Sequence, residues 1–377
     1  MKASRGLIAL ATVGACVLAT SVDTASSRPS ATSLPKGGPT AAAVKEAKQL
    51  VAAAKAKPTF KAPGAQVNGS VLKNKSIWVI TNVNVAMNTP IIQGIKQASK
   101  LFGAKVTVFD AAGKVSEMNR GMSQAISAHA DAIVESGIAP NLTSAPLAQA
   151  KAKHIPVVDA FGTSVDTPKL PGNFAHVSIL FSQGGKLQVD YLLSDSNGSA
   201  VDAVIFNDTE FPSEAERARG MVAEFKRLCP ACKYQEQNVE LANVATQLKS
   251  LTETTLRRDP AINYILADYD YQAQFIIPGV IEAGALGKVR VISPDASAPN
   301  LNLLRQKQQL VDIGEPLTWS GWAIVDEVIR ALNNKAPVNE NIPQRIFDTT
   351  NLPAKNNEAT MFGTSYINGY RHLWGLK

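Results

Sequence analysis

Two cysteines with two residues between them are the part of this sequence whose spacing most resembles a reactive motif. Cys229-Pro-Ala-Cys232 follows a segment with helical spacing and precedes a strand-like run that begins at Lys233. The spacing fits a local disulfide, and it also fits a thioredoxin-like redox pair. A redox pair of that kind opens a helix after a strand, whereas this pair is predicted to close a helix. We therefore predict a structural disulfide, with the redox pair as the alternative.

The histidines do not form a pattern that would support catalysis or metal binding. They are scattered and lack metal-ligand spacing: His129, His154, His176 and His372. The two neighbouring cysteines have no second Cys or His pair to complete a zinc site. The sequence also lacks the Gly-x-Ser-x-Gly nucleophile turn and the Gly-x-x-x-x-Gly-Lys-Ser/Thr phosphate loop. We therefore predict that the protein is not an enzyme and has no cofactor and no metal site.

The elements that must position any binding residues follow one repeated plan in the first half of the chain. An apolar run at 77–81 leads through a polar loop to Thr89, a candidate N-cap, and Pro90 at the first helical position. The helix is expected to end near Gly103, which suits a left-handed terminal residue. Strands alternating with helices predict parallel β-α-β units, which bind ligands at the carboxyl ends of their strands. Further strands are expected at 105–109, 132–134 and 155–158, and a helix at 115–128.

The second half of the chain repeats this alternation. Gly184-Gly185 is predicted to start a helix after a strand at 173–178. About 310 residues are too many for one core and suit two domains. The predicted fold class is therefore α/β, with two similar lobes built on parallel sheets. Further strands are expected at 201–206, 234–239, 262–266, 289–292 and 310–313, and helices at 213–228, 243–257, 271–283 and 320–332.

Residues 1–27 have the features of an export signal, because two basic residues precede an apolar stretch that is too short to span a membrane comfortably. Within it, Val13-Gly14-Ala15-Cys16 resembles a lipobox, in which Cys16 would be lipidated. The alternative is an ordinary signal cleaved near Ser21 or Ala25. The protein is expected to be exported to the periplasm or the cell surface, and to contact the membrane only through the signal or a lipid anchor.

Residues 28–69 are predicted to form a flexible tether that contains an Ala/Lys-rich helix at 41–56, either on a surface or mobile. The formal net charge of +7 is concentrated near this end of the chain. Residues 1–61 hold nine Lys or Arg against two Asp or Glu, so residues 62–377 balance to zero. A neutral body lacks the basic surface that binds a phosphate backbone, and we predict no nucleic-acid partner.

Several segments together resemble the type I periplasmic-binding-protein family, in particular the ribose-binding-like solute receptors of ABC importers. The resemblance covers about residues 74–377, and the order and spacing of the segments carry it rather than a catalytic signature. These segments are 76–102, 177–185, 213–220, 265–270, 291–295, 311–316 and 370–374.

This resemblance implies two Rossmann-like lobes with parallel sheets, joined by a three-crossover hinge that closes on a ligand. The crossovers would fall near Ile179, Glu315 and Thr349. Lobe one would comprise residues 70–178 plus 315–348. Lobe two would comprise residues 179–314 plus 349–377.

The same resemblance implies which residues touch the ligand in lobe two. Arg217 matches an arginine that donates to ligand hydroxyls, and Asp295 matches a carboxylate that accepts from them. Glu315 stands where sugar binders often carry an amide. Tyr269 stands where they often carry Asn, with Asp270 beside it.

These residue types also have structural alternatives. Arg217 could form an ion pair with Glu214 or Glu216 on the surface of its helix. Asp295 and Asp270 could each cap the helix that follows. The sequence leaves both alternatives open.

In lobe one the chain departs from its sugar-binding relatives. The first loop, 82–88, lacks the paired aromatic residues that stack on a sugar ring, and the fourth strand is followed by Phe161 without the usual arginine. Phe161, Asn82, Asn84 and Ser136 are therefore the lobe-one candidates, and a simple pentose or hexose is disfavoured. The implied partners of a monomeric receptor are a small polar, sugar-like ligand and an ABC permease. The alternative is a sensing receptor that signals to a membrane kinase or chemoreceptor.

Overall fold

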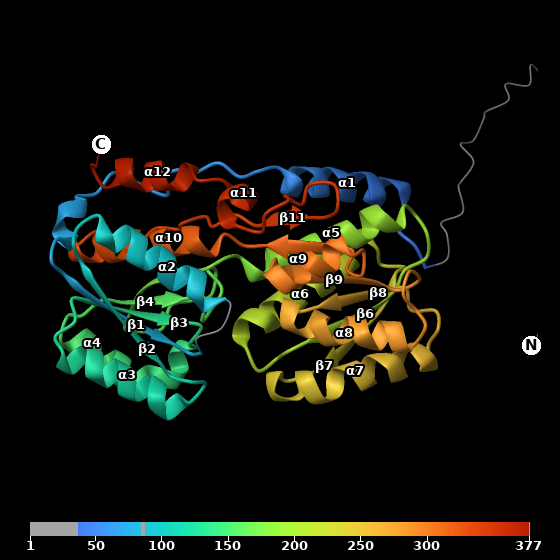
Figure 1. The fold of residues 1–377 in the computed structure, drawn as a ribbon, viewed down its shortest axis with the longest axis horizontal. Helices are drawn as coiled ribbons and strands as arrows, with labels where there is room; N and C mark the ends of the chain where they lie inside the picture. The colour runs from blue at the N-terminus through green and yellow to red at the C-terminus, as the bar shows by residue number, and fades with distance from the viewer. Residues whose placement is uncertain (1–36, 84–86, 377) are drawn as a thin grey trace, which may run out of the picture. The chain divides into compact units, whose positions relative to one another are not determined.

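Alternating strands and helices build two lobes, each around its own sheet, in a computed structural model that describes residues 37–83 and 87–376 (Figure 1). The predicted export signal at 1–27, Cys16, the start of the tether at 28–36, and Asn84 lie outside the described residues. Within the described ranges, no helix has the length and apolar character needed to cross a membrane.

Lobe one is built on a five-stranded sheet whose neighbouring strands are all parallel, in the order β2-β1-β3-β4-β5. Helices α2 and α10 cover one face of this sheet, and α3 and α4 cover the other (Figure 1). The bounds are β1 Ser76–Thr81, α2 Asn88–Lys100, β2 Lys105–Asp110, α3 Val115–Ser127, β3 Ala132–Ser136, α4 Ser144–Ala152, β4 Val157–Ala160, β5 Asn173–Val177 and α10 Leu317–Leu332.

Lobe two is built on a six-stranded sheet in the order β11-β10-β9-β8-β6-β7. Its strands are parallel except for β11, which pairs antiparallel with β10. Helices α5 and α6 pack on one face, and α7 and α8 on the other. The bounds are α5 Phe181–Ser196, β6 Asp202–Asn207, α6 Pro212–Leu228, β7 Lys233–Asn238, α7 Leu241–Arg258, β8 Tyr264–Ala267, α8 Asp270–Glu282, β9 Arg290–Asp295, α9 Ala298–Arg305, β10 Val311–Gly314 and β11 Arg345–Phe347.

Two predicted helix starts are wrong. Helix α2 begins at Asn88, before the predicted cap Thr89, and Gly103 beyond its end has the expected left-handed φ of 69°. Helix α5 begins at Phe181, so Gly185 lies inside it rather than at its start. A side chain at Gly185 would overlap the Arg217 carbonyl oxygen, so this glycine serves the close contact between α5 and α6.

The Ala/Lys-rich helix forms as predicted, at α1 Ala41–Lys55, but it packs into a core instead of lying on a surface. Ala43, Ala47 and Val51 are buried in the lobe-two core against α5. Lys55 Nζ lies 2.7 Å from Asp348 Oδ2 and fixes the end of the helix next to β11. The part of the predicted tether in α1 therefore contributes to lobe two, because small alanines allow close helix packing, whereas Phe60 and Val67 beyond it pack against the lobe-one core.

The C-terminal part of the predicted lobe division is also wrong. Strand β11 belongs to the lobe-two sheet although it was assigned to lobe one, so the crossover lies before it, at residues 333–344, and not near Thr349. Helix α12 Ser365–Leu373 packs in the lobe-one core although it was assigned to lobe two. Aromatic residues explain this position, because Tyr366 of α12 stacks on Trp319, and Trp374, directly after the helix, stacks on Trp322.

Candidate ligand-binding site

Polar side chains gather at the carboxyl ends of the lobe-two strands, where the predicted site lies. Arg217 projects from the second turn of α6 and meets carboxyl groups from its own helix, from the end of β9 and from the turn after β10, together with a backbone oxygen after β8. We name these residues the Arg217 cluster: Arg217, Glu214, Asp268, Asp295 and Glu315. The parallel order of the strands brings their ends to one edge of the sheet and so assembles the cluster.

Groups of the protein occupy both terminal nitrogens of the Arg217 guanidinium, whereas its Nε atom is buried without a hydrogen-bond partner. Nη1 donates to Glu214 Oε2 and to the backbone oxygen of Asp268, and Nη2 donates to Glu315 Oε1 at 3.2 Å. Nη2 also lies 3.8 Å from Asp295 Oδ1. The ring of Phe181 covers the guanidinium carbon at 5.0 Å. With its side chain 1% exposed, Arg217 connects four segments of lobe two.

Both explanations given for Arg217 by the sequence are thus modified. The ion pair with Glu214 exists, but it is buried rather than on the helix surface, and Glu216 pairs instead with Arg219. The role of Arg217 as a ligand donor remains a prediction. Sequence reasoning did not identify Asp268, whose carboxyl is fully buried beside the arginine, or Phe181.

Burial dominates the electrostatics of the carboxyl groups in the cluster. It raises the pKa of Asp295 to about 6, of Glu214 to about 7 and of Glu315 to about 8, while the charge of Arg217 lowers each of them. Burial also raises the pKa of Asp268 well above its ordinary value. Burial by itself would lower the pKa of Arg217, but the surrounding carboxylates raise it, so the arginine stays charged.

The most accessible polar atoms of the cluster are carboxylate oxygens. The side chain of Asp295 is 26% exposed and that of Glu214 is 15% exposed, whereas Glu315 is 1% exposed. Asp295 has a left-handed φ of 105°, and its turn is held because Ala296 N donates to Asp312 Oδ1 at 2.8 Å. The turn therefore presents the Asp295 carboxylate in a fixed place.

The two other lobe-two candidates have partners inside the lobe. The Tyr269 hydroxyl donates to Asp208 Oδ2 at 2.9 Å. The Asp270 carboxylate accepts from the Ser293 hydroxyl and from Ser297 N, the N-cap residue of α9. Asp270 therefore orders the turn before α9, in addition to opening α8. Its predicted contact with a ligand is untested.

In lobe one, the candidates lie at the ends of β1, β3 and β4. Ser136 is buried and its hydroxyl donates to Asn88 Oδ1 at 2.8 Å, and Asn82 N donates to the Ser136 carbonyl oxygen at 3.0 Å. Phe161 is buried with a left-handed φ of 61°, and its ring meets Phe181 edge to face at 6.5 Å. These contacts place the candidates at one edge of the sheet, and their contact with a ligand remains a prediction.

A row of buried ionisable side chains, which the sequence analysis missed, supports this edge. Glu135, Asp159 and His176 are register neighbours on β3, β4 and β5. His176 Nδ1 lies 2.7 Å from Asp159 Oδ2, and the other Asp159 oxygen accepts from Gly162 N at 3.0 Å. Asp159 thereby fixes the turn that carries Phe161. The signal in the sequence was a charged residue inside each of two otherwise apolar strands.

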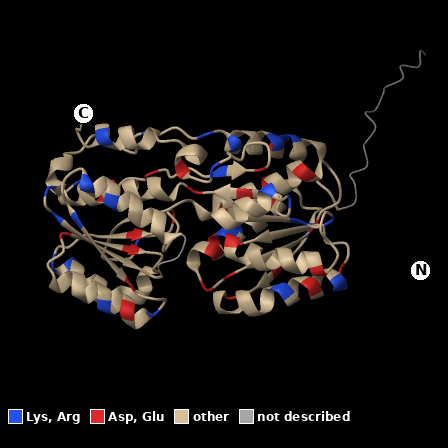
Figure 2. Ribbon diagram, viewed as in Figure 1, with Lys and Arg blue, Asp and Glu red and all other residues tan. Residues whose placement is uncertain are grey.

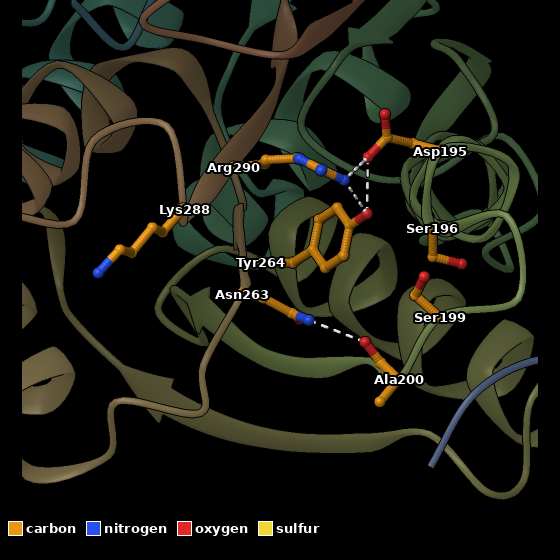
Figure 3. A pocket seen from close by; sticks show the side chains of 8 residues that line it. All are labelled: Asp195, Ser196, Ser199, Ala200, Asn263, Tyr264, Lys288 and Arg290. Atoms are coloured by element: carbon orange, nitrogen blue, oxygen red, sulfur yellow. Dashed lines mark hydrogen bonds and ion pairs between the residues drawn. The ribbon is translucent and has the colours of Figure 1, made fainter. Parts of the chain in front are cut away.

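A pocket of about 300 Å³ lies at the ends of the lobe-two strands opposite to the Arg217 cluster. Figure 3 shows the side chains that line it. Tyr264 opens β8 and Arg290 opens β9, so the pocket borders the amino ends of these strands. Arg290 and the Tyr264 hydroxyl both contact Asp195 at the end of α5. This network ties α5 to the sheet, and ligands of parallel sheets bind at the other edge. The lining residues are Asp195, Ser196, Ser199, Ala200, Asn263, Tyr264, Lys288 and Arg290.

The predicted disulfide is confirmed. Cys229 and Cys232 are bonded, with their Cα atoms 5.3 Å apart, between the end of α6 and the start of β7. Both residues are buried, so the position does not suit a redox pair. Elsewhere in residues 37–83 and 87–376, His, Cys, Asp and Glu form no group of three or more that could hold a metal ion.

Comparison with known proteins identifies the family. Residues 77–336 match the family described as "Periplasmic binding protein domain". No curated protein matches the chain. Among solved structures, an ABC transporter solute-binding protein from Burkholderia graminis, in complex with D-arabinose, is 21% identical with a TM-score of 0.67, and the match covers 76% of this chain and 99% of that one.

Two further solved structures share the fold at lower identity. A solute-binding protein from Agrobacterium vitis, bound with α-D-tagatopyranose, is 16% identical with a TM-score of 0.65, over 74% of this chain and 96% of that one. The Caulobacter myo-inositol binding protein is 16% identical with a TM-score of 0.65, over 74% and 95%. Because the family match spans most of both lobes, this chain belongs to the periplasmic binding protein family, with the type I fold of the ribose-binding-like solute receptors.

Proposed function

We propose that this protein is an extracytoplasmic solute receptor that captures a small polar, sugar-like molecule and delivers it to an ABC importer. The observation that carries the proposal is the Arg217 cluster at the carboxyl ends of the lobe-two strands, where Asp295 offers an accessible carboxylate. Hydroxyl groups are natural donors to such a carboxylate. The relatives with D-arabinose, tagatopyranose and myo-inositol bound support a polyhydroxyl ligand.

Closure of the two lobes is the proposed mechanism. A ligand held by Asp295 in lobe two and by the β1 and β4 turns in lobe one would stabilise the closed arrangement, which a permease then recognises. The chain changes lobe between β5 and α5, between β10 and α10, and between α10 and β11, and these three segments are the proposed hinge. Glu315 follows β10 directly, so the hinge adjoins the cluster.

A thermal-shift screen of the purified protein against sugars, polyols, nucleosides and amino acids tests the proposal. A ligand at one hundred times its dissociation constant adds about 2.7 kcal/mol to the free energy of unfolding. We expect a saturable shift with a polyhydroxyl compound and its loss in Asp295→Ala. The surface variant Glu282→Gln is the control and should bind as the wild type does. A folded protein that no polyhydroxyl compound stabilises would refute the proposal.

Transport, rather than sensing, is tested by uptake of the identified ligand. Cells that lack the protein should lose high-affinity uptake, whereas a purely sensing receptor would leave uptake intact and abolish the response. We further propose that residues 1–27 direct export and that the mature protein is a monomer. Mass spectrometry of the mature N-terminus distinguishes lipidation at Cys16 from ordinary cleavage, and light scattering gives the oligomeric state.

A further inference from the structure

The exposed side chains of the Arg217 cluster are acidic, whereas Arg217 is buried and its Nε atom has no hydrogen-bond partner. Both terminal nitrogens of Arg217 face protein oxygens, from Glu214, Glu315, Asp295 and the Asp268 backbone. The exposed part of the cluster therefore consists of the carboxylate oxygens of Asp295 and Glu214. A ligand that reaches this surface meets hydrogen-bond acceptors.

The charges of the cluster do not balance. Three ion pairs, to Glu214, Asp295 and Glu315, share the single guanidinium of Arg217. Asp268 is packed beside the same guanidinium, and Asp208 follows closely, since its backbone N–H donates to Asp268 Oδ2 at 3.0 Å. Four carboxyl groups thus act on one cation, with the Asp208 carboxyl acting on Glu214, and partial ionisation of these groups already leaves a negative excess.

A second observation points to a missing positive partner. Asp268 is fully buried, and its Oδ1 atom has no hydrogen-bond partner. Burial contributes most to the raised pKa of Asp268, and the charges of Glu214 and Arg217 act on it next. Its other oxygen, Oδ2, accepts from the backbone N–H of Asp208, so the carboxyl lies within the acidic group. Buried polar atoms normally find partners, so an orphaned carboxyl oxygen within an acidic group favours a ligand that brings donors and positive charge.

We propose that the ligand of this receptor carries a positively charged amine in addition to hydroxyl groups, and that Asp295 and Glu214 receive the ammonium. The class is that of an amino sugar or an amino polyol. An ammonium group offers three donors and a full charge, which suits two neighbouring carboxylates. The inference rests on the proposed function and specifies the substrate class of the same site.

The proposal has a consequence for the effect of pH on binding. Burial places the pKa of Asp295 at about 6 and that of Glu214 at about 7, so the site gains negative charge as the pH rises through this range. The affinity for an amine should rise with it, and the affinity for a neutral sugar should stay constant. The titratable or charged groups that face the cluster are Asp208, Glu214, Arg217, Asp268, Tyr269, Asp270, Asp295, Asp312 and Glu315.

Matched pairs of compounds test the proposal by isothermal titration calorimetry on the whole purified protein. D-glucosamine is compared with D-glucose and with N-acetyl-D-glucosamine, and D-galactosamine is compared with D-galactose. We expect each amine to bind at least about tenfold more tightly than its neutral partners, about 1.4 kcal/mol. Between about pH 5 and about pH 7 the amine affinity should rise, with proton release on binding.

Two variants locate the effect. Asp295→Asn and Glu214→Gln keep the shape of each side chain and remove its charge, and each should reduce the amine preference while the circular dichroism spectrum is unchanged. The control Glu282→Gln lies on the surface of lobe two, where it pairs with Lys249, and should keep the preference. If Glu214→Gln fails to fold, Asp295→Asn and the pH series still decide the question.

Three results would overturn the inference. Neutral sugars that bind as tightly as their amines would refute the charge requirement and leave the proposed receptor function intact. An amine preference that survives both variants would place the ammonium elsewhere. Failure of every amine and every neutral polyhydroxyl compound to bind the folded protein would refute the inference together with the proposed function.

Discussion

Glu135 is expected to make the stability of the protein fall as the pH rises, and Glu135→Gln should remove this effect. Glu135 lies on β3 in the lobe-one sheet and is fully buried. The Thr143 hydroxyl donates to its Oε1 atom, and Oε2 has no partner. Burial raises the pKa of Glu135 from 4.5 to about 8, the Thr143 hydrogen bond lowers it, and the nearby Asp159 raises it further.

The sign and size of the effect follow from proton linkage. Because the pKa of Glu135 is higher in the folded protein than in the unfolded chain, the folded protein holds an extra proton between pH 4.5 and about 8. The free energy of unfolding is therefore greatest below this window and falls as the pH rises through it. pH 7 lies about 2.5 pH units above the pKa of Glu135 in the unfolded chain, and each unit lowers the free energy of unfolding by about 1.4 kcal/mol. The loss of stability at pH 7 is therefore about 3 kcal/mol.

Urea unfolding followed by circular dichroism, at about pH 5 and about pH 7.5, measures this loss. Other buried carboxyls also contribute to the pH dependence, so the informative quantity is the difference between wild type and variant. A glutamine at this position keeps an acceptor for Thr143 and has no charge to acquire. From the lower to the higher pH, the free energy of unfolding of Glu135→Gln should therefore rise by about 3 kcal/mol relative to that of the wild type.

The exposed variant Glu282→Gln is the control and should follow the wild type at both pH values. If Glu135→Gln shows the same pH dependence as the wild type to within about 1 kcal/mol, Glu135 is ionised in the folded protein and the reasoning is refuted. A variant that loses stability at both pH values equally would mean that the carboxyl group contributes packing or hydrogen bonding that an amide cannot replace.

Three further predictions concern the two lobes. Arg217→Met should lower the free energy of unfolding by about 3 to 5 kcal/mol at neutral pH, because it leaves buried carboxylates unpaired. The loss should be smaller near pH 5. In the same urea-unfolding measurement, Arg219→Met on the same helix should cost under about 1 kcal/mol. Equal costs for the two arginines would contradict the buried pairing. Reduction of Cys229–Cys232 should lower the free energy of unfolding by about 2 kcal/mol, the value for a loop of this length. Ligand binding, measured by calorimetry, should be unchanged. A loss of binding would give the pair a functional role. Gly94→Ala would overlap the Thr318 carbonyl oxygen and should cost about 1 to 3 kcal/mol in thermal unfolding, and an unchanged midpoint would mean that α2 and α10 are less closely packed than described.

The regular alternation of strands and helices was predictable because it is written in local patterns. Apolar runs bounded by turn residues gave ten strands of the two sheets to within two or three residues, and the helices between them follow from periodicity. The strand missed was β11, Arg345–Phe347, which is short and lies at the edge of its sheet. Its antiparallel pairing with β10 depends on a partner more than thirty residues away, and no local pattern encodes it.

The zero net charge of residues 62–377 was predictable from the sequence by counting. Figure 2 adds that Lys, Arg, Asp and Glu occur on the helices of both lobes with the two signs interspersed. The charge of the candidate site was not predictable. The sequence indicated Arg217 and Asp295 separately, each with a structural alternative. The structure adds that they form one buried cluster with Glu214, Asp268 and Glu315, in which a single cation serves several carboxyl groups.

By itself, the sequence determined the α/β class, the two lobes, the disulfide and the edge of each sheet at which a ligand is expected, because all of these depend on spacing along the chain. Only the tertiary structure decided that α1 packs into lobe two and α12 into lobe one, since their small and aromatic side chains find distant partners. It likewise decided that the terminal nitrogens of Arg217 bind protein oxygens and that the Asp295 side chain is partly exposed. Burial and pairing depend on which strand ends meet in space, and this property belongs to the fold rather than to any segment of the chain.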